Sequence, residues 1–158
     1  MARILQSKLY PPLHLTGEVV FHPRPKINRG TGQAYYPQKY VDFKRRAALE
    51  LALRWKQKPT ITEAVELRLI LMYSKPKSRI RKKTAEQRII RSHSRGDLDN
   101  AVKSVIDSLQ DARVISNDNQ VWRLSAEMWW CGVGETPYTT IEITGTEKGS
   151  WSAVQGIV

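Results

Sequence analysis

The sequence is poor in residues that build disulfides and soft-metal sites, since its 158 residues include one cysteine and three histidines. A single cysteine, Cys131, excludes an internal disulfide and a cysteine-rich zinc site. No glycine-rich phosphate loop or Ser-His-Asp order is present either. We therefore expect no small-molecule cofactor and no disulfide framework.

Long apolar segments are also missing. No run approaches the ~20 apolar residues that a membrane-spanning helix needs. The opening stretch MARILQSKLYPPL has too few consecutive apolar residues for a signal peptide. These absences favour a soluble protein of the cytoplasm with no membrane partner.

Acidic residues are in the minority, with 15 against 26 basic ones and a net charge of +11. The hydrophobic content of 41% is that of a globular protein, and the length suits one domain over residues 1–158. A strong positive charge favours a polyanionic partner, most commonly nucleic acid. A merely basic surface is the alternative interpretation of the same composition.

The charges are unevenly distributed along the chain. Residues 75–95 contain nine basic residues against one acidic residue, a net charge of +8. Residues 97–118 follow at once with five aspartates against two basic residues, a net charge of −3. A uniformly solvated surface does not explain this separation. The basic residues that we expect to contact DNA lie in this block and in the loop 22–37: Arg24, Lys26, Arg29, Lys75, Lys77, Arg79, Arg81, Lys82, Lys83, Arg88, Arg91 and Arg95.

Hydrophobic periodicity indicates an α+β fold, with a mixed or antiparallel sheet and helices packed on one face. The stripe of an amphipathic helix starts at Tyr40 and ends at Trp55. The core of the domain is expected at 17–145, with a weakly predicted tail at 146–158. The predicted strands are 18–22, 65–72, 122–131 and 138–144, the last two as a hairpin, and the predicted helices are 38–56, a short one at 84–90, and 98–111.

The helix after residue 97 combines an apolar face with charged residues. Asp99, Lys103 and Asp107 follow one another at four-residue intervals and share the polar side. Lys103 therefore suits either an ion pair with Asp99 or the stabilisation of charge on a phosphate. The apolar face is predicted to contain Leu98, Ala101, Val102, Val105, Ile106 and Leu109.

Two aspartates, Asp97 and Asp99, open this helix, and Asp118 follows it after a short loop. Hard divalent cations such as Mg²⁺ bind oxygen ligands, commonly one or two carboxylates with phosphate and water. A return of the chain that brings Asp118 beside Asp97 would complete such a site. Aspartate also caps helices and suits turns, so a purely structural role fits the same spacing.

The order and spacing of these residues resemble the signature of the RusA-like endonucleases, a family that resolves Holliday junctions. The loop from Gly17 to Pro37 also resembles phage-type members, so the similarity covers about Gly17 to Thr144. The matching elements are Asp97-Leu98-Asp99-Asn100, Lys103, Asp107-Ser108-Leu109, Asp118 and Gln120-Val121.

The resemblance implies an endodeoxyribonuclease that needs Mg²⁺ or Mn²⁺ and acts as a homodimer on four-way DNA junctions, in recombination and repair. Asp97, Asp99 and Asp118 correspond to the metal-binding aspartates of the family, and Lys103 corresponds to its catalytic lysine. The expected setting is the cytoplasm of a bacterial or phage-infected cell. Candidate supporting residues are Asn100, Asp107 and Asn117.

Two positions depart from the usual pattern. Gly96 stands where many members have Pro or Arg, and Asn117 stands where many have a second acid. These departures support one alternative, a catalytically weak or inactive protein that binds branched DNA. A second alternative, a nuclease for flaps or replication forks, stays open because branch recognition depends on DNA shape.

Overall fold

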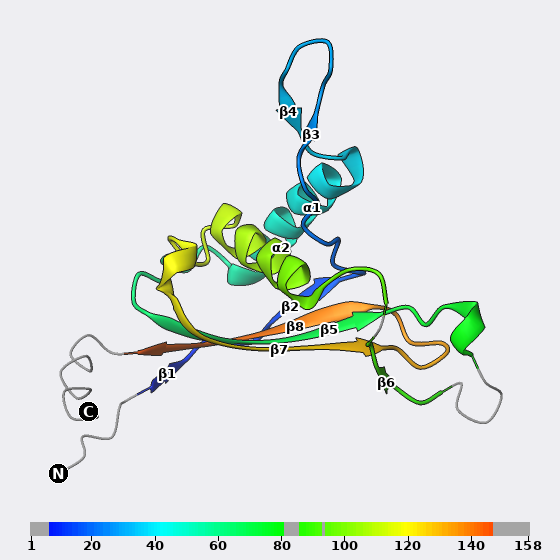
Figure 1. Ribbon diagram of the computed structural model, residues 1–158. Helices are drawn as coiled ribbons and strands as arrows, with labels where there is room; N and C mark the ends of the chain where they lie inside the picture. Colours follow the sequence, from blue (N-terminus) through cyan, green and yellow to red (C-terminus); the bar gives the residue numbers. More distant parts are fainter. Residues whose placement is uncertain (1–6, 81–85, 93, 147–158) are drawn as a thin grey trace, which may run out of the picture.

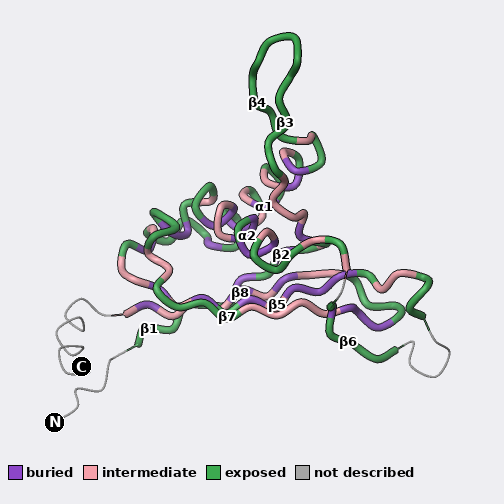
Figure 2. Tube along the Cα trace, viewed as in Figure 1, coloured by how far each residue is buried: buried purple, intermediate pink, exposed green. Residues whose placement is uncertain are grey.

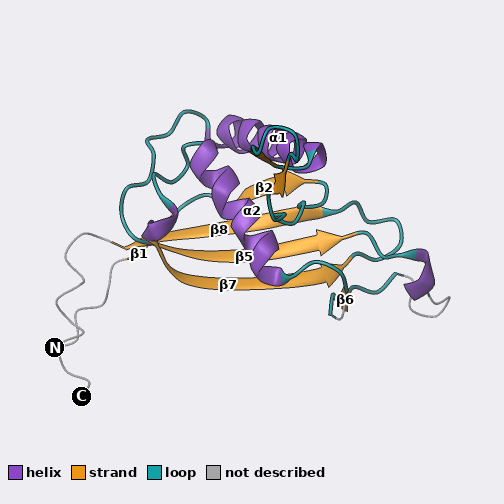
Figure 3. Ribbon diagram, turned by 45° about the horizontal axis from the view of Figure 1, so that its top comes forward, coloured by secondary structure: helices purple, strands orange, loops and turns teal. Residues whose placement is uncertain are grey.

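The computed structural model describes residues 7–80, 86–92 and 94–146, which form one α+β domain (Figure 1). Two helices lie on the same face of a mixed sheet, as the sequence predicts (Figure 3). The elements are β1 (Ser7–Leu9), β2 (Leu13–Thr16), β3 (Lys26–Ile27), β4 (Ala34–Tyr35), α1 (Gln38–Trp55), β5 (Val65–Tyr73), β6 (Ile89–Ile90), α2 (Leu98–Asp111), β7 (Val121–Trp130) and β8 (Tyr138–Thr146).

Strand β5 lies at the centre of the main sheet, whose order is β1-β8-β5-β7-β6, with β2 also paired to β8. It pairs antiparallel with β8 along one edge and parallel with β7 along the other. Leu67, Leu69 and Leu71 point from it into the core and are fully buried. The opposite face of the sheet carries ion pairs such as Arg68–Glu142, so only one face needs a covering layer.

Helix α2 is the crossover between the parallel strands β5 and β7. It therefore begins near the end of β5 and finishes near the start of β7 (Figure 1). Its 14 residues span roughly 20 Å at the α-helical rise of ~1.5 Å per residue. Residues before and after α2 are consequently held at opposite ends of a rod.

The amphipathic pattern of α1 is confirmed. Its buried residues are Tyr40, Phe43, Ala47, Leu51 and Trp55. Helix α1 contacts α2 and β2, so the two helices form one layer over the sheet (Figure 2). A lysine, Lys56, ends the helix in a left-handed conformation with φ of 52°.

The buried face of α2 is rotated from the predicted one. Leu98 is 39% exposed and Ile106 is only partly buried, whereas Ser104 and Ser108 are fully buried. Each serine hydroxyl donates to the carbonyl one turn earlier, at 3.1 Å and 2.7 Å, so burial leaves neither hydroxyl unpaired. Leu98 and Ile106 are thereby free to line a surface groove.

Three predicted elements are wrong. Residues 18–22 are not a strand, because the strand of this region is β2 at Leu13–Thr16. The predicted helix at 84–90 is contradicted at its end, where Ile89–Ile90 form β6 and pair with β7; residues 81–85 lie outside the described part. Strands β7 and β8 do not form a hairpin, because β5 is inserted between them.

The sheet extends beyond the predicted core toward the amino terminus, since β1 and β2 precede Gly17. Most of the predicted tail, 147–158, lies outside the described residues. In the part of the chain that the structure describes, no helix is long and apolar enough to cross a membrane.

The central position of β5 predicts a large effect of mutation. Leu69→Ala should lower the free energy of unfolding by about 2–5 kcal/mol, because it opens a cavity at a fully buried site. Leu53→Ala, at an exposed position of α1, should change it by less than about 0.5 kcal/mol. Urea unfolding of both variants measures the difference, and similar losses would contradict the assigned core.

Candidate active site

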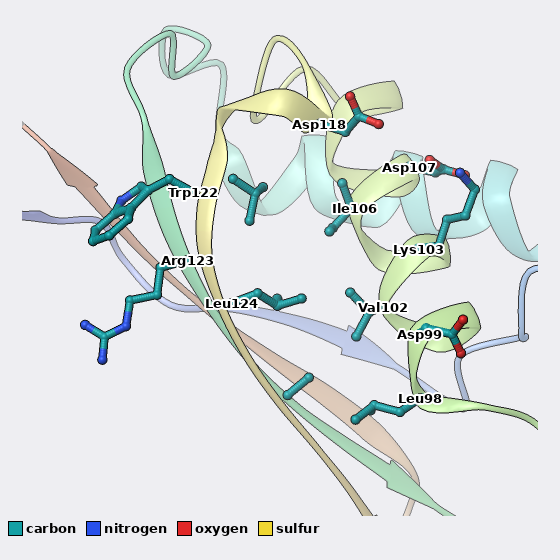
Figure 4. A pocket seen from close by; sticks show the side chains of 12 residues that line it. Leu98, Asp99, Val102, Lys103, Ile106, Asp107, Asp118, Trp122, Arg123 and Leu124 are labelled. Carbon is teal, nitrogen blue, oxygen red and sulfur yellow. The ribbon is translucent and has the colours of Figure 1, made fainter. Parts of the chain in front are cut away.

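A groove of about 800 Å³ runs between α2 and β7 (Figure 4). Leu98, Val102 and Ile106 project into it from α2 and face Leu124 on β7. Its floor is therefore apolar, and its charged residues sit along the rim. The charged residues are Asp99, Lys103, Asp107, Asp118 and Arg123.

Asp97 occupies the N-cap position of α2 but does not cap it. Its backbone is extended, with φ of −93° and ψ of 147°, and its side chain accepts no hydrogen bond from the first turn. Aspartate at this position ordinarily contributes a cap hydrogen bond. The carboxylate of Asp97 is thus exposed and available for another partner.

Four charged side chains have no bonding partner among the described residues. Asp97, Asp99, Lys103 and Asp118 are all exposed. Within residues 7–80, 86–92 and 94–146 they form no side-chain hydrogen bond and no ion pair, so the Asp99–Lys103 ion pair is absent. Burial does not explain their placement, and neither does pairing.

The neighbouring acids are engaged. Asp107 accepts a hydrogen bond from the Tyr40 hydroxyl at 3.4 Å and lies 3.9 Å from His22. Burial, and next the charge of Asp107, raise the pKa of Tyr40 to about 12, so the phenol stays protonated at neutral pH and can donate. Asp111 pairs with Lys44 at 2.8 Å. Asp107, predicted as a supporting residue, therefore contacts Tyr40 and His22 and also lines the groove.

Asn117 and Gln120 hold the loop that presents Asp118. The Asn117 side chain accepts the backbone N–H of Asn119 at 3.0 Å, and Gln120 accepts that of Asn117 at 2.7 Å. Gln120 also donates to the carbonyls of Ile61 and Glu63 at 3.0 Å and 2.8 Å. This reciprocal cap holds the 3₁₀ turn Asp118–Gln120 and gives Asn117 a structural role, through a side-chain oxygen that an aspartate would also supply.

The three free aspartates do not gather at one point. Asp97 is the N-cap residue of α2. Asp99 lies at the start of the helix, and Asp118 lies beyond its other end (Figure 4). Among the described residues, no three Asp, Glu, His or Cys side chains are close enough to hold a metal ion together. The expected return of Asp118 to the side of Asp97 does not occur within this chain.

Most of the predicted DNA-contacting residues are exposed, in two regions. Arg24, Lys26 and Arg29 belong to a projecting segment that contains the β3–β4 hairpin (Figure 1). Lys77, Arg79 and Arg95 lie beyond the ends of β5 and β6. Two further residues have partners in the chain, since Lys75 donates to the carbonyl of Gln87 at 2.6 Å and Arg88 pairs with Glu135 at 2.7 Å. Arg81, Lys82 and Lys83 lie outside the described residues.

Arg91 is the exception, because it is 8% exposed. This burial points to a role inside the protein, and the predicted contact of Arg91 with DNA stays a prediction. Its guanidinium lies over the rings of Phe21, Tyr73 and Trp130, and burial lowers its pKa. A charge count cannot distinguish such a residue from its solvated neighbours.

Gly96 is explained by its surroundings. Its φ of +95° is unfavourable for residues with a side chain. A Cβ at this position would lie 2.5 Å from the ring of Phe21. Glycine is therefore required by the packing just before Asp97.

Sequence reasoning missed the apolar residues of β7. Trp122 is 49% exposed and Leu124 is 44% exposed, both at the groove. The outer edge of β7 from Val121 to Glu127 has no strand partner in the described part of the chain. Exposed apolar side chains on an open strand edge mark an interaction surface. The available signal was the run Val121, Trp122 and Leu124 directly after the acidic loop.

A comparison with family models shows to which family the chain belongs. A model of the family described as Endodeoxyribonuclease RusA matches residues 16–144 of the 158-residue chain. The chain therefore belongs to the RusA family of endodeoxyribonucleases, and the resemblance seen in its motifs is confirmed. At the level of the family, the activity is endonucleolytic cleavage of Holliday junctions. A search of curated proteins found no matching sequence.

The division between free and engaged side chains predicts unequal effects on stability at two adjacent residues. Asn117→Ala should lower the free energy of unfolding by about 1 kcal/mol, because it removes a cap. Asp118→Asn should change it by less than about 0.5 kcal/mol, because the carboxylate has no partner in the part of the chain that the structure describes. Chemical denaturation of both variants tests this, and a larger loss at Asp118 would show that it is structural.

Proposed function

We propose that this protein is a metal-dependent, structure-selective endonuclease that resolves four-way DNA junctions by paired nicking, in DNA recombination and repair. One observation carries the proposal. Three aspartates and a lysine that have no side-chain partner among the described residues line or flank a groove, in a chain of the RusA endodeoxyribonuclease family. Exposed acids without partners are costly in a DNA-binding protein, because they repel phosphate. A catalytic use explains their presence.

The donor set suits a hard divalent cation, Mg²⁺ or Mn²⁺. Asp97, Asp99 and Asp118 offer carboxylate oxygens only, without the nitrogen and sulfur ligands of a zinc site. When bound, the cation would polarise the scissile phosphate and make a water a better nucleophile. Asp97 and Asp99 would supply the protein ligands at the start of α2, since Mg²⁺ commonly takes one or two carboxylates together with phosphate.

Lys103 lies one turn after Asp99 on the rim of the same groove. Its ammonium would stabilise the negative charge that develops on the phosphate or on the leaving oxygen. The exposed basic residues around the projecting hairpin and beyond β5 would hold the phosphate backbone. Such contacts position DNA without reading bases, so branch selectivity would come from shape.

The metal role of Asp97 predicts a separation of binding from cleavage. Asp97→Asn should abolish nicking and retain or tighten junction binding, because one negative charge near phosphate is removed. Asp111→Asn is the matched control on α2, since Asp111 pairs with Lys44 on the outer side. Gel assays of a labelled junction with and without Mg²⁺ measure both properties. Full cleavage by Asp97→Asn would overturn the assignment.

A homodimer is part of this proposal, and the geometry of α2 supports it. A two-fold axis crossing the groove near the middle of α2 would place the partner subunit's Asp118 near Asp97 and Asp99. The acids at opposite ends of one helix would then meet between two copies. The exposed Trp122 and Leu124 and the open edge of β7 are available for the contact. Such a dimer would present one site to each of two opposed strands.

Disruption of this surface predicts a joint loss of assembly and activity. Leu124→Glu should shift the protein to monomer and abolish metal-dependent nicking, because it puts a charge into an apolar contact. Leu49→Glu, an exposed leucine on α1, should leave both unchanged. Equilibrium sedimentation with parallel nicking assays tests this. A Leu124→Glu dimer with wild-type activity would rule out this surface.

The rival functions predict different substrates. A non-catalytic binder of branched DNA would show no scission of four-way, three-way, flap or linear DNA in Mg²⁺ or Mn²⁺. A flap or fork nuclease would cut the flap or three-way substrate faster than the four-way junction. The positive φ of Gly96 and its contact with Phe21 explain one of the two departures, which weakens the sequence-based support for an inactive protein.

A further inference from the structure

Arg91 lies immediately after β6, where the chain turns toward the start of α2. Its backbone N–H donates to the carbonyl of Met128 at 2.9 Å, which ties it to β7. Its side chain points into the protein and leaves the residue 8% exposed. No Asp or Glu in the described residues pairs with it, so the cation is held by other means.

Three aromatic rings surround the guanidinium. Its central carbon lies 4.9 Å from the ring centre of Phe21, 4.6 Å from that of Tyr73 and 4.8 Å from that of Trp130. Phe21 and Tyr73 are themselves stacked, with centres 5.5 Å apart and an angle of 4° between their planes. The electron-rich faces of aromatic rings attract a cation in this way, so the guanidinium is confined in a cage.

The two terminal nitrogens of the guanidinium donate hydrogen bonds to the backbone just before α2. Nη2 donates to the carbonyl of Arg95 at 2.6 Å, and Nη1 is 3.3 Å from that of Gly96. These are the two peptide groups directly before Asp97. A planar fork suits two adjacent carbonyls in a way that a lysine ammonium does not.

The same short segment is fixed from its other side. Gly96 is packed so tightly against Phe21 that a Cβ would lie 2.5 Å from the ring. One turn later, the backbone N–H of His22 donates to the carbonyl of Asn100 at 3.0 Å. The segment Asp97–Asn100 is therefore fixed at both ends, by the packing of Gly96 on Phe21 and by the hydrogen bond between His22 and Asn100.

We propose that Arg91 is a positioning residue that fixes the backbone of Asp97 and Asp99 for metal binding. This role rests on the proposed nuclease function. It also explains why a charge is buried at a cost. The Arg91 Nε, the Tyr73 hydroxyl and the Trp130 Nε1 have no hydrogen-bond partner in the structure. Burial of polar groups without hydrogen-bond partners does not favour stability. We therefore attribute the buried charge to the two hydrogen bonds that it makes with the carbonyls of Arg95 and Gly96.

Two variants of Arg91 test this role. Arg91→Met keeps much of the volume and removes the fork, and Arg91→Lys keeps the charge and loses the double grip. Arg68→Met is the control, since Arg68 is an exposed strand residue paired with Glu142 at 3.6 Å. Three properties are measured on full-length protein: junction binding in EDTA, nicking rate against Mn²⁺ concentration, and hydrogen exchange of the segment 94–101.

The expected pattern separates positioning from DNA contact. In Arg91→Met, nicking at low Mn²⁺ should fall by about tenfold or more and recover in part at high Mn²⁺, as for residues that orient metal ligands. Exchange in 94–101 should become faster, whereas junction binding should stay within about twofold of wild type, because a buried side chain makes no phosphate contact. Arg91→Lys should lie between Arg91→Met and wild type, and it replaces Arg91→Met if that variant does not fold.

Two results would contradict the positioning role of Arg91. Unchanged exchange and unchanged Mn²⁺ dependence in a folded Arg91→Met protein would overturn the positioning role. Loss of junction binding in parallel with nicking at every Mn²⁺ concentration would make Arg91 a DNA contact instead. If wild-type protein does not nick, the proposed function fails, and the exchange comparison still decides whether Arg91 braces the start of α2.

Discussion

Burial of β5 between β7 and β8 is the constraint on which the arrangement of this protein depends. A strand paired on both edges, with leucines filling one face, needs a helical layer over that face. Because β7 runs parallel to β5, the chain must cross over the sheet between them, and α2 is that crossover. The positions of the acidic residues before, on and after α2 follow from this route.

The same route explains the division of roles among the charged residues. Packing of α2 on the sheet buries Ala101, Val105 and Leu109 and turns Asp99 and Lys103 outward. Acids that have structural partners, such as Asp107 and Asp111, lie on the side of α2 that faces α1. The acids without a side-chain partner among the described residues, Asp97, Asp99 and Asp118, lie at or beyond the two ends of α2. Separation by the length of a helix makes a single copy of the chain an incomplete metal site in our proposal.

The sequence predicted those features that depend on local periodicity. The buried stripe of α1 and the alternating strand β5 are both set by residues close in the chain. Features set by packing between distant segments were not predictable in this way. The insertion of β5 between β7 and β8 is one example, and the rotation of α2 that buries Ser104 is another. Arg91 lies in the same basic segment as the other candidate DNA contacts, and only the fold shows that three aromatic rings surround it.

The family signature predicted more of the candidate site than periodicity did, because it grouped four residues as candidates: Asp97, Asp99, Lys103 and Asp118. Spacing along the chain gave no distance between the ends of α2, so the separation of Asp118 from Asp97 emerged only from the fold. The structural roles of Gly96 and Asn117 also emerged only from the fold, which gives Gly96 a positive φ and makes Asn117 the cap of a 3₁₀ turn.

The central claim is that two copies share their carboxylates across a two-fold axis. Mixed dimers of Asp97→Asn and Asp118→Asn chains, formed by co-expression and assayed on a labelled junction with Mg²⁺, test it most directly. Each variant alone has no intact site, whereas a mixed dimer of shared sites has one. The account predicts that mixing restores nicking at about a quarter of all sites, as random pairing of a two-fold dimer requires. No recovery on mixing, with mixed dimers verified by mass spectrometry, would contradict it.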